Sequence, residues 1–77
     1  MSIQLSATLW KEDSVFIAKC AELDVASDGK TPDEALANLK EALELWIENA
    51  KTSGILDDYS AVLNSTSRFM SYIELDI

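Results

Sequence analysis

Residues 31–51, TPDEALANLKEALELWIENAK, constrain the fold more than any other stretch, because they carry the signals of a complete helix. Thr31 is suited to cap the N-terminus, and Pro32 needs no N–H at the first helical position. Glu34 can reach back to the Thr31 amide and complete a capping box. Gly54 follows shortly and is typical of a helix C-terminal stop. The sequence therefore predicts one long helix here.

Apolar residues recur along this helix at three- and four-residue steps, which places them on one face. They are Ala35, Leu36, Leu39, Leu43, Trp46, Ile47 and Ala50. Charged and amide side chains fall largely on the opposite side of the helix. This pattern predicts a surface helix that packs one face on a core.

The flanking segments alternate between apolar and polar residues, which is typical of half-buried strands. They predict strands over residues 3–10, 15–20, 25–27 and 68–77. Between the last two of these, apolar residues at Leu56, Tyr59, Val62 and Leu63 lie on one helical face and predict a short helix within residues 55–64. In the second strand, Lys19 shares a face with Val15 and Ile17, so Phe16, Ala18 and Cys20 are predicted to point inward. Gly29, after the third strand, is expected to adopt a positive φ.

The order strand, strand, strand, helix, strand predicts a single α+β domain over residues 1–77. Three strands joined by short loops form an antiparallel meander, and a right-handed crossover favours placing the last strand beside the first. The expected sheet is therefore four-stranded and mixed, in the order 3-2-1-4, with the helix on one face.

The sheet face that the helix leaves uncovered is predicted to be unusually apolar for a solvated surface. It would carry Trp10, Val15, Ile17, Met70 and Tyr72. Scattered exposed apolar residues are an ordinary alternative. We expect these five residues to form an interface between copies of the chain.

Charge and composition limit the possible functions. The 77 residues carry a net charge of −8, which disfavours nucleic-acid binding and favours a basic partner. There is no histidine, and Cys20 is the single cysteine, so no zinc site, metal site or thiol–imidazole pair is expected. Cys20 is predicted to be a small buried residue. No cofactor motif, signal peptide or membrane span is evident, and we expect a cytoplasmic protein that is not an enzyme.

The run VFIAKCAELDVASDGKTPDEALANLKEALELWIE, residues 15–48, resembles the HicB-like antitoxin family. That family has a Cys-x-Glu-Leu turn, a Ser-x-Gly-x-Thr segment and an EALxNxKEA helix in this order. The matching positions are Cys20, Glu22, Leu23, Ser27, Gly29, Thr31, Glu34, Ala35, Leu36, Asn38, Lys40, Glu41 and Ala42. Ala21 replaces a frequent proline of the family, and Ser14 replaces a common turn glycine.

The resemblance implies a partial ribonuclease-H-like fold and an antitoxin role in a type II toxin–antitoxin pair. The partner would be a small, basic, mRNA-cleaving HicA-like toxin, which the antitoxin occludes. The acidic turns suggest Glu12, Asp13, Glu22 and Asp24 as toxin-contacting residues, although ordinary solvated turns would look the same.

Two alternatives stay open. Many HicB antitoxins carry a C-terminal DNA-binding module, and none follows residue 77, so the chain could be a solitary oligomeric interaction module without a toxin. We expect a homo-oligomer, a dimer or a tetramer, in either case. A degenerate ribonuclease-H-like enzyme would need converging carboxylates, but no strand centre before Glu74 and Asp76 offers one.

Overall fold

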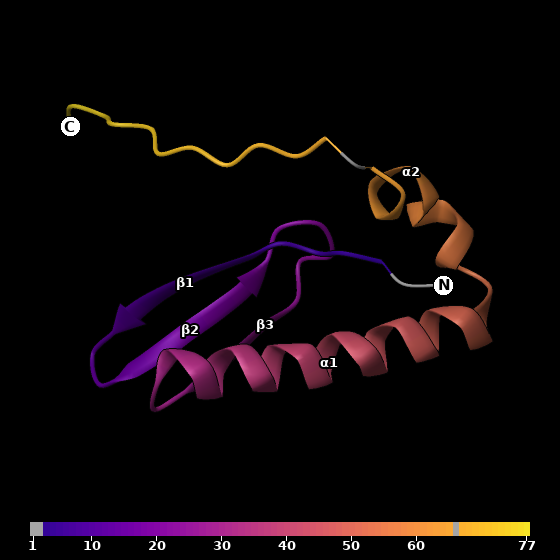
Figure 1. Ribbon diagram of the computed structural model, residues 1–77, viewed down its shortest axis with the longest axis horizontal. Helices are drawn as coiled ribbons and strands as arrows, with labels where there is room; N and C mark the ends of the chain where they lie inside the picture. Colours follow the sequence, from indigo (N-terminus) through magenta and orange to yellow (C-terminus); the bar gives the residue numbers. More distant parts are fainter. Residues whose placement is uncertain (1–2, 66) are drawn as a thin grey trace.

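The computed structural model describes residues 3–65 and 67–77. Three strands, β1 (Ala7–Glu12), β2 (Val15–Cys20) and β3 (Ala26–Gly29), form an antiparallel sheet in the order β1-β2-β3. The long helix α1 (Pro32–Ser53) lies across one face of the sheet (Figure 1). A 3-10 turn, η1 (Leu56–Tyr59), and the short helix α2 (Ser60–Leu63) follow.

The helix α1 confirms the prediction from the sequence. Thr31 Oγ1 accepts a hydrogen bond from the Glu34 amide at 3.1 Å. The Glu34 carboxylate accepts from the Lys30 amide at 3.4 Å instead of the predicted Thr31 amide. Gly54 ends the helix with φ 78, and its amide donates to the Ala50 carbonyl.

The core lies between α1 and the inner face of the sheet. Ala18 and Cys20 point inward from β2, as predicted, and meet Ala35 and Leu39 of α1. The predicted apolar face over residues 55–64 covers one end of this core, where Leu63 is buried. Phe16, Leu43, Trp46, Ile47, Leu56, Tyr59 and Val62 are partly buried against the same cluster.

Gly29 does not adopt the predicted positive φ and lies inside β3. Its backbone is so close to α1 that an added Cβ would come within 2.5 Å of the Ala35 nitrogen and 2.8 Å of the Glu34 carbonyl carbon. Glycine is therefore needed here for the close approach of β3 to the helix.

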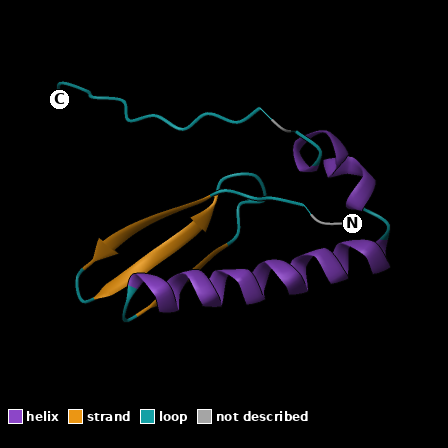
Figure 2. Cartoon of the chain, viewed as in Figure 1, coloured by secondary structure: helices purple, strands orange, loops and turns teal. Residues whose placement is uncertain are grey.

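The predicted four-stranded mixed sheet of order 3-2-1-4 is wrong. Residues 68–77 are extended but belong to no strand, and they run separately from the sheet (Figure 2). Alternation defines the two faces of a strand, but it does not specify which edge the strand joins. The expected crossover beside β1 therefore does not occur, and β1 is an edge of the sheet.

The first strand also begins later than predicted, at Ala7 instead of residue 3. The amide of Ser6 donates to the Glu22 carboxylate, so it is not available to a strand partner. At its other end β1 extends to Glu12, and a tight turn at Asp13, with φ 53, leads into β2.

Candidate functional site

The four acidic residues predicted to contact a partner lie at opposite ends of the sheet. Glu12 and Asp13 belong to the turn between β1 and β2, and Glu22 and Asp24 belong to the turn between β2 and β3. The whole length of β2 separates the two turns (Figure 1). The structure therefore divides the predicted contact residues into two separate acidic turns.

The first acidic turn is exposed and borders the open sheet face. The Glu12 carboxylate accepts a hydrogen bond from Trp10 Nε1 at 2.9 Å, and both side chains are exposed. Asp13 is exposed in the left-handed backbone region, which aspartate tolerates better than most residues. This turn thus combines two exposed carboxylates with an exposed aromatic ring.

In the second turn, Asp24 is exposed and Glu22 is not. Asp24 adopts φ 52 and pairs with Lys19 at 3.0 Å, but its side chain is 89% exposed. An ion pair this exposed contributes little to stability, so Asp24 remains available to a partner. The Glu22 side chain is only 7% exposed.

Glu22 is held by a set of local donors. Its carboxylate accepts from the Ser6 amide at 2.7 Å, from Ser6 Oγ at 2.5 Å and from Cys20 Sγ at 3.5 Å. Arg68 Nε lies 3.8 Å away, close enough for charge attraction but without a hydrogen bond. Glu22 therefore ties the chain before β1 to the end of β2, and it is a structural residue.

Two opposing effects act on the Glu22 carboxyl. Burial by itself would raise its pKa, but the hydrogen bonds from Ser6 and Cys20, together with the Arg68 charge, lower the pKa below its usual range. The Glu22 carboxylate also influences the pKa of the Cys20 thiol. Burial raises the pKa of the Cys20 thiol, and the neighbouring Glu22 charge adds to the effect, although backbone hydrogen bonds at Leu23 and Glu22 oppose it. Cys20 is thus a buried thiol, in agreement with the sequence.

The residues predicted to form an oligomer interface are only partly brought together. Trp10 is paired across the strands with Ile17, and Val15 is paired with Glu12, so these three apolar residues share the open sheet face. Met70 and Tyr72 lie in the extended segment away from the sheet, and both are exposed.

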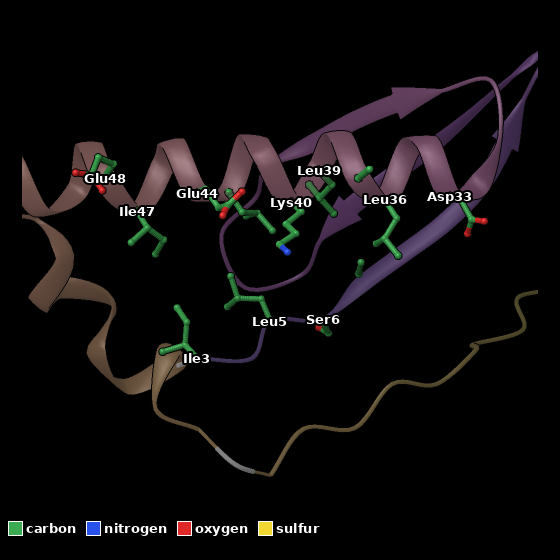
Figure 3. Close-up of a pocket in the computed structure, with 13 residues that line it drawn as sticks. Ile3, Leu5, Ser6, Asp33, Leu36, Leu39, Lys40, Glu44, Ile47 and Glu48 are labelled. Atoms are coloured by element: carbon green, nitrogen blue, oxygen red, sulfur yellow. The ribbon is translucent and has the colours of Figure 1, made fainter. Parts of the chain in front are cut away.

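The sequence did not predict a groove that lies on the helix side of the sheet, next to the start of β1. It lies between α1 and the chain that leads into β1, and its volume is about 850 Å³ (Figure 3). Ile3 and Leu5 face Leu36 and Ile47 across it. Leu36 belongs to the predicted apolar face of α1 but is still 45% exposed, so the three-stranded sheet does not cover this helix face completely.

The acidic residues dominate the surface. Every aspartate and glutamate of the chain except Glu22 is exposed. Among residues 3–65 and 67–77, no group of three or more histidine, cysteine, aspartate or glutamate side chains is arranged to hold a metal ion. The exposed carboxylates are distributed over the sheet and its turns, α1, η1 and residues 69–77.

No helix in the described part of the chain is long and apolar enough to cross a membrane. Comparison of the chain with models of protein families, with characterised proteins and with solved structures finds no match. The resemblance to the HicB-like family therefore rests on the motif residues alone and stays a prediction.

Proposed function

We propose that this chain is an acidic protein-binding module of the antitoxin type, which binds and occludes a small basic HicA-like mRNA-cleaving toxin. The observation that carries the proposal is the dispersed surface of exposed carboxylates combined with a net charge of −8. A negative surface steers a positively charged partner toward it and disfavours RNA, so it suits a protein that competes with RNA for a basic face.

The contact residues proposed for this partner are Glu12, Asp13 and Asp24. All three are exposed: Glu12 is the last residue of β1, and Asp13 and Asp24 lie in the turns that follow β1 and β2. Glu22 contributes indirectly, because its bonds to Ser6 fix the position of the second turn. The free aromatic ring of Trp10 beside Glu12 adds an apolar contact of the kind enriched in binding sites.

We propose a binding role without catalysis. The chain has no histidine to act as a general base, and its one thiol is buried. The carboxylates of Glu74 and Asp76, which a ribonuclease-H-like enzyme would need to combine with others, lie on an exposed segment away from the sheet. The same proposal includes a cytoplasmic location and no direct binding of nucleic acid.

The second candidate is a solitary homo-oligomeric interaction module with no cognate toxin. Exposed apolar side chains favour it: Trp10 on the open sheet face, and Met70 and Tyr72 on the extended segment. Exposed apolar surface of this extent marks association sites in soluble proteins.

The test is to purify the chain with the product of the adjacent reading frame and to measure complex formation by size-exclusion chromatography with light scattering. We expect a stable complex that dissociates as salt is raised, because exposed charges are screened. Failure to form a complex at micromolar concentrations in low salt would reject the antitoxin role and leave the second candidate.

Two double variants with the same change in net charge test whether the position of the carboxylates matters for binding. Glu12→Lys with Asp13→Lys reverses the first acidic turn, and Asp57→Lys with Asp58→Lys makes the same change of charge at η1. We expect the first pair to weaken the complex much more than the second. Equal effects would show that only the net charge matters and would remove the turn from the contact surface.

A further inference from the structure

The extended segment of residues 69–77 has the composition of a strand but the exposure of an unpaired chain. Phe69 is 94% exposed and Ile73 is 83% exposed, and both belong to the same alternate set of side chains. Leu75 and Ile77 continue that set, while Met70, Tyr72, Glu74 and Asp76 form the other. Soluble proteins rarely leave so many large apolar side chains of one short segment in water.

The sheet offers an unused place for a strand of this type. β1 is paired with β2 on one side only, and no described residue pairs with its outer edge. The groove of about 850 Å³ begins at the first residue of that edge, Ala7, and continues along residues 3–6, where Leu5, Leu36 and Leu43 line it. A strand that pairs with the start of β1 and continues along residues 3–6 would therefore project alternate side chains over an apolar groove.

The apolar set of side chains in residues 69–77 matches the apolar lining of the groove. With Phe69, Ile73, Leu75 and Ile77 turned toward the groove, both acidic residues of the segment, Glu74 and Asp76, would face away from it. This matters because Asp33, Glu44 and Glu48 line the groove on the helix side, as does a single cation, Lys40. An inserted carboxylate would be repelled there, but an apolar side chain is not.

The segment and the edge belong to one chain, yet the fold keeps them apart. Arg68 anchors the start of the segment through hydrogen bonds to the carbonyl oxygens of Gln4 and Val62, the latter at 2.8 Å. From there the segment runs separately from the sheet (Figure 1). We propose that residues 69–77 of one copy add as a strand to the β1 edge of a second copy, in a reciprocal exchange that forms a dimer.

Symmetry and area both favour a second copy as the occupant. An exchange about a two-fold axis satisfies both unpaired edges and both exposed segments at once. Phe69 and Tyr72 from the two copies would bury roughly 600–1,000 Å² on the segment side alone. A specific interface needs about 1,200–2,000 Å² counted over both sides, so the segments supply enough surface.

This exchange would also place Met70 and Tyr72 of the second copy beside Trp10 on the open sheet face. The proposal rests on the self-association given above as the second candidate and specifies the strands that make it. The strand exchange and toxin binding would share Trp10, but Asp13 and Asp24 lie in turns beyond the ends of β1 and β2.

The test is the dissociation constant of the full chain, measured by analytical ultracentrifugation for the wild type and two variants. Ile73→Asp places a charge against the apolar groove and is expected to weaken dimerisation by about tenfold or more. Leu45→Asp makes the same chemical change at an exposed position of α1 and is expected to leave the dissociation constant unchanged. Both variants are checked for an unchanged circular dichroism spectrum.

A second measurement identifies the strands. In a mixture of isotope-labelled and unlabelled chains, we expect intermolecular NOEs from Ile73 and Leu75 to Leu5 and Leu36. A monomer at high micromolar concentration overturns the proposal. A dimer that Ile73→Asp does not weaken would keep the self-association but overturn the strand exchange. The strand exchange would also be overturned if these NOEs arose only within one chain.

Discussion

Both oxygens of the Glu22 carboxylate accept hydrogen bonds from Ser6, one from the amide and one from the hydroxyl. Residues sixteen positions apart are thereby joined at the point where the chain enters β1. Arg68 lies beside this pair and anchors the start of the exposed segment. The contact therefore fixes both the position of the second acidic turn and the origin of residues 69–77.

Replacing Glu22 with glutamine is expected to destabilise the fold by about 1–3 kcal/mol. The neutral amide removes the charge that strengthens these bonds and attracts Arg68, and the Ser6 hydroxyl must accept from the new NH₂ group instead of donating. Urea unfolding followed by circular dichroism measures this loss. Asp24→Asn, at the exposed end of the same turn, is the control and should cost less than about 0.5 kcal/mol. Equal costs for the two variants would mean that the Ser6 bonds contribute no stability.

The lowered pKa of Glu22 predicts a loss of stability in acid. The carboxyl binds a proton less readily in the folded than in the unfolded chain, so the unfolded state takes up more protons as pH falls. The contribution of Glu22 is complete above the unfolded value of about 4.3 and is lost as pH falls from there through the folded value. The free energy of unfolding, measured from pH 7 to pH 3, should fall less steeply in Glu22→Gln. Parallel curves would contradict this assignment.

Thr31→Ala should reduce stability by about 1 kcal/mol, because it removes the acceptor for the Glu34 amide at the N-terminus of α1. The matched control is Thr52→Ala in the last turn of the same helix, where the hydroxyl only donates to the Glu48 carbonyl. Thermal unfolding of both variants provides the comparison. A control that is as destabilised as Thr31→Ala would show that the cap is not the cause.

Gly29→Ala tests the close approach of β3 to α1. The new Cβ would overlap the backbone of Ala35, which cannot move without displacing the helix, and we expect a cost of about 3 kcal/mol. Gly54→Ala meets no atom within 4 Å and is strained only by its positive φ, so it should cost about 1 kcal/mol. Chemical unfolding would contradict the account if Gly54→Ala proved the more damaging change.

The sequence predicted α1 well because the determinants of a helix are local. Thr31, Pro32 and Gly54 lie at its ends, and its apolar period is read within a few turns. The inward residues of β2 were predicted for the same reason, since Lys19 excludes one face from the core.

The contacts that the sequence did not predict connect distant residues. Nothing in the sequence near Glu22 indicates that its side chain meets Ser6 and Arg68, so the local pattern predicts only an acidic turn residue there. For residues 68–77 the sequence predicts a long-range pairing that the structure does not contain. Their alternation predicts a strand, which is wrong, because a strand also needs an edge to pair with and no local pattern specifies one.

The most direct test of the antitoxin proposal is an RNA cleavage assay in which the product of the adjacent reading frame is titrated with this chain. We expect cleavage to fall in proportion to the added chain and to cease near equimolar amounts. The variant carrying Glu12→Lys, Asp13→Lys and Asp24→Lys should inhibit much less at the same ratios. Cleavage that continues unchanged in a large molar excess of the wild-type chain would contradict the proposal.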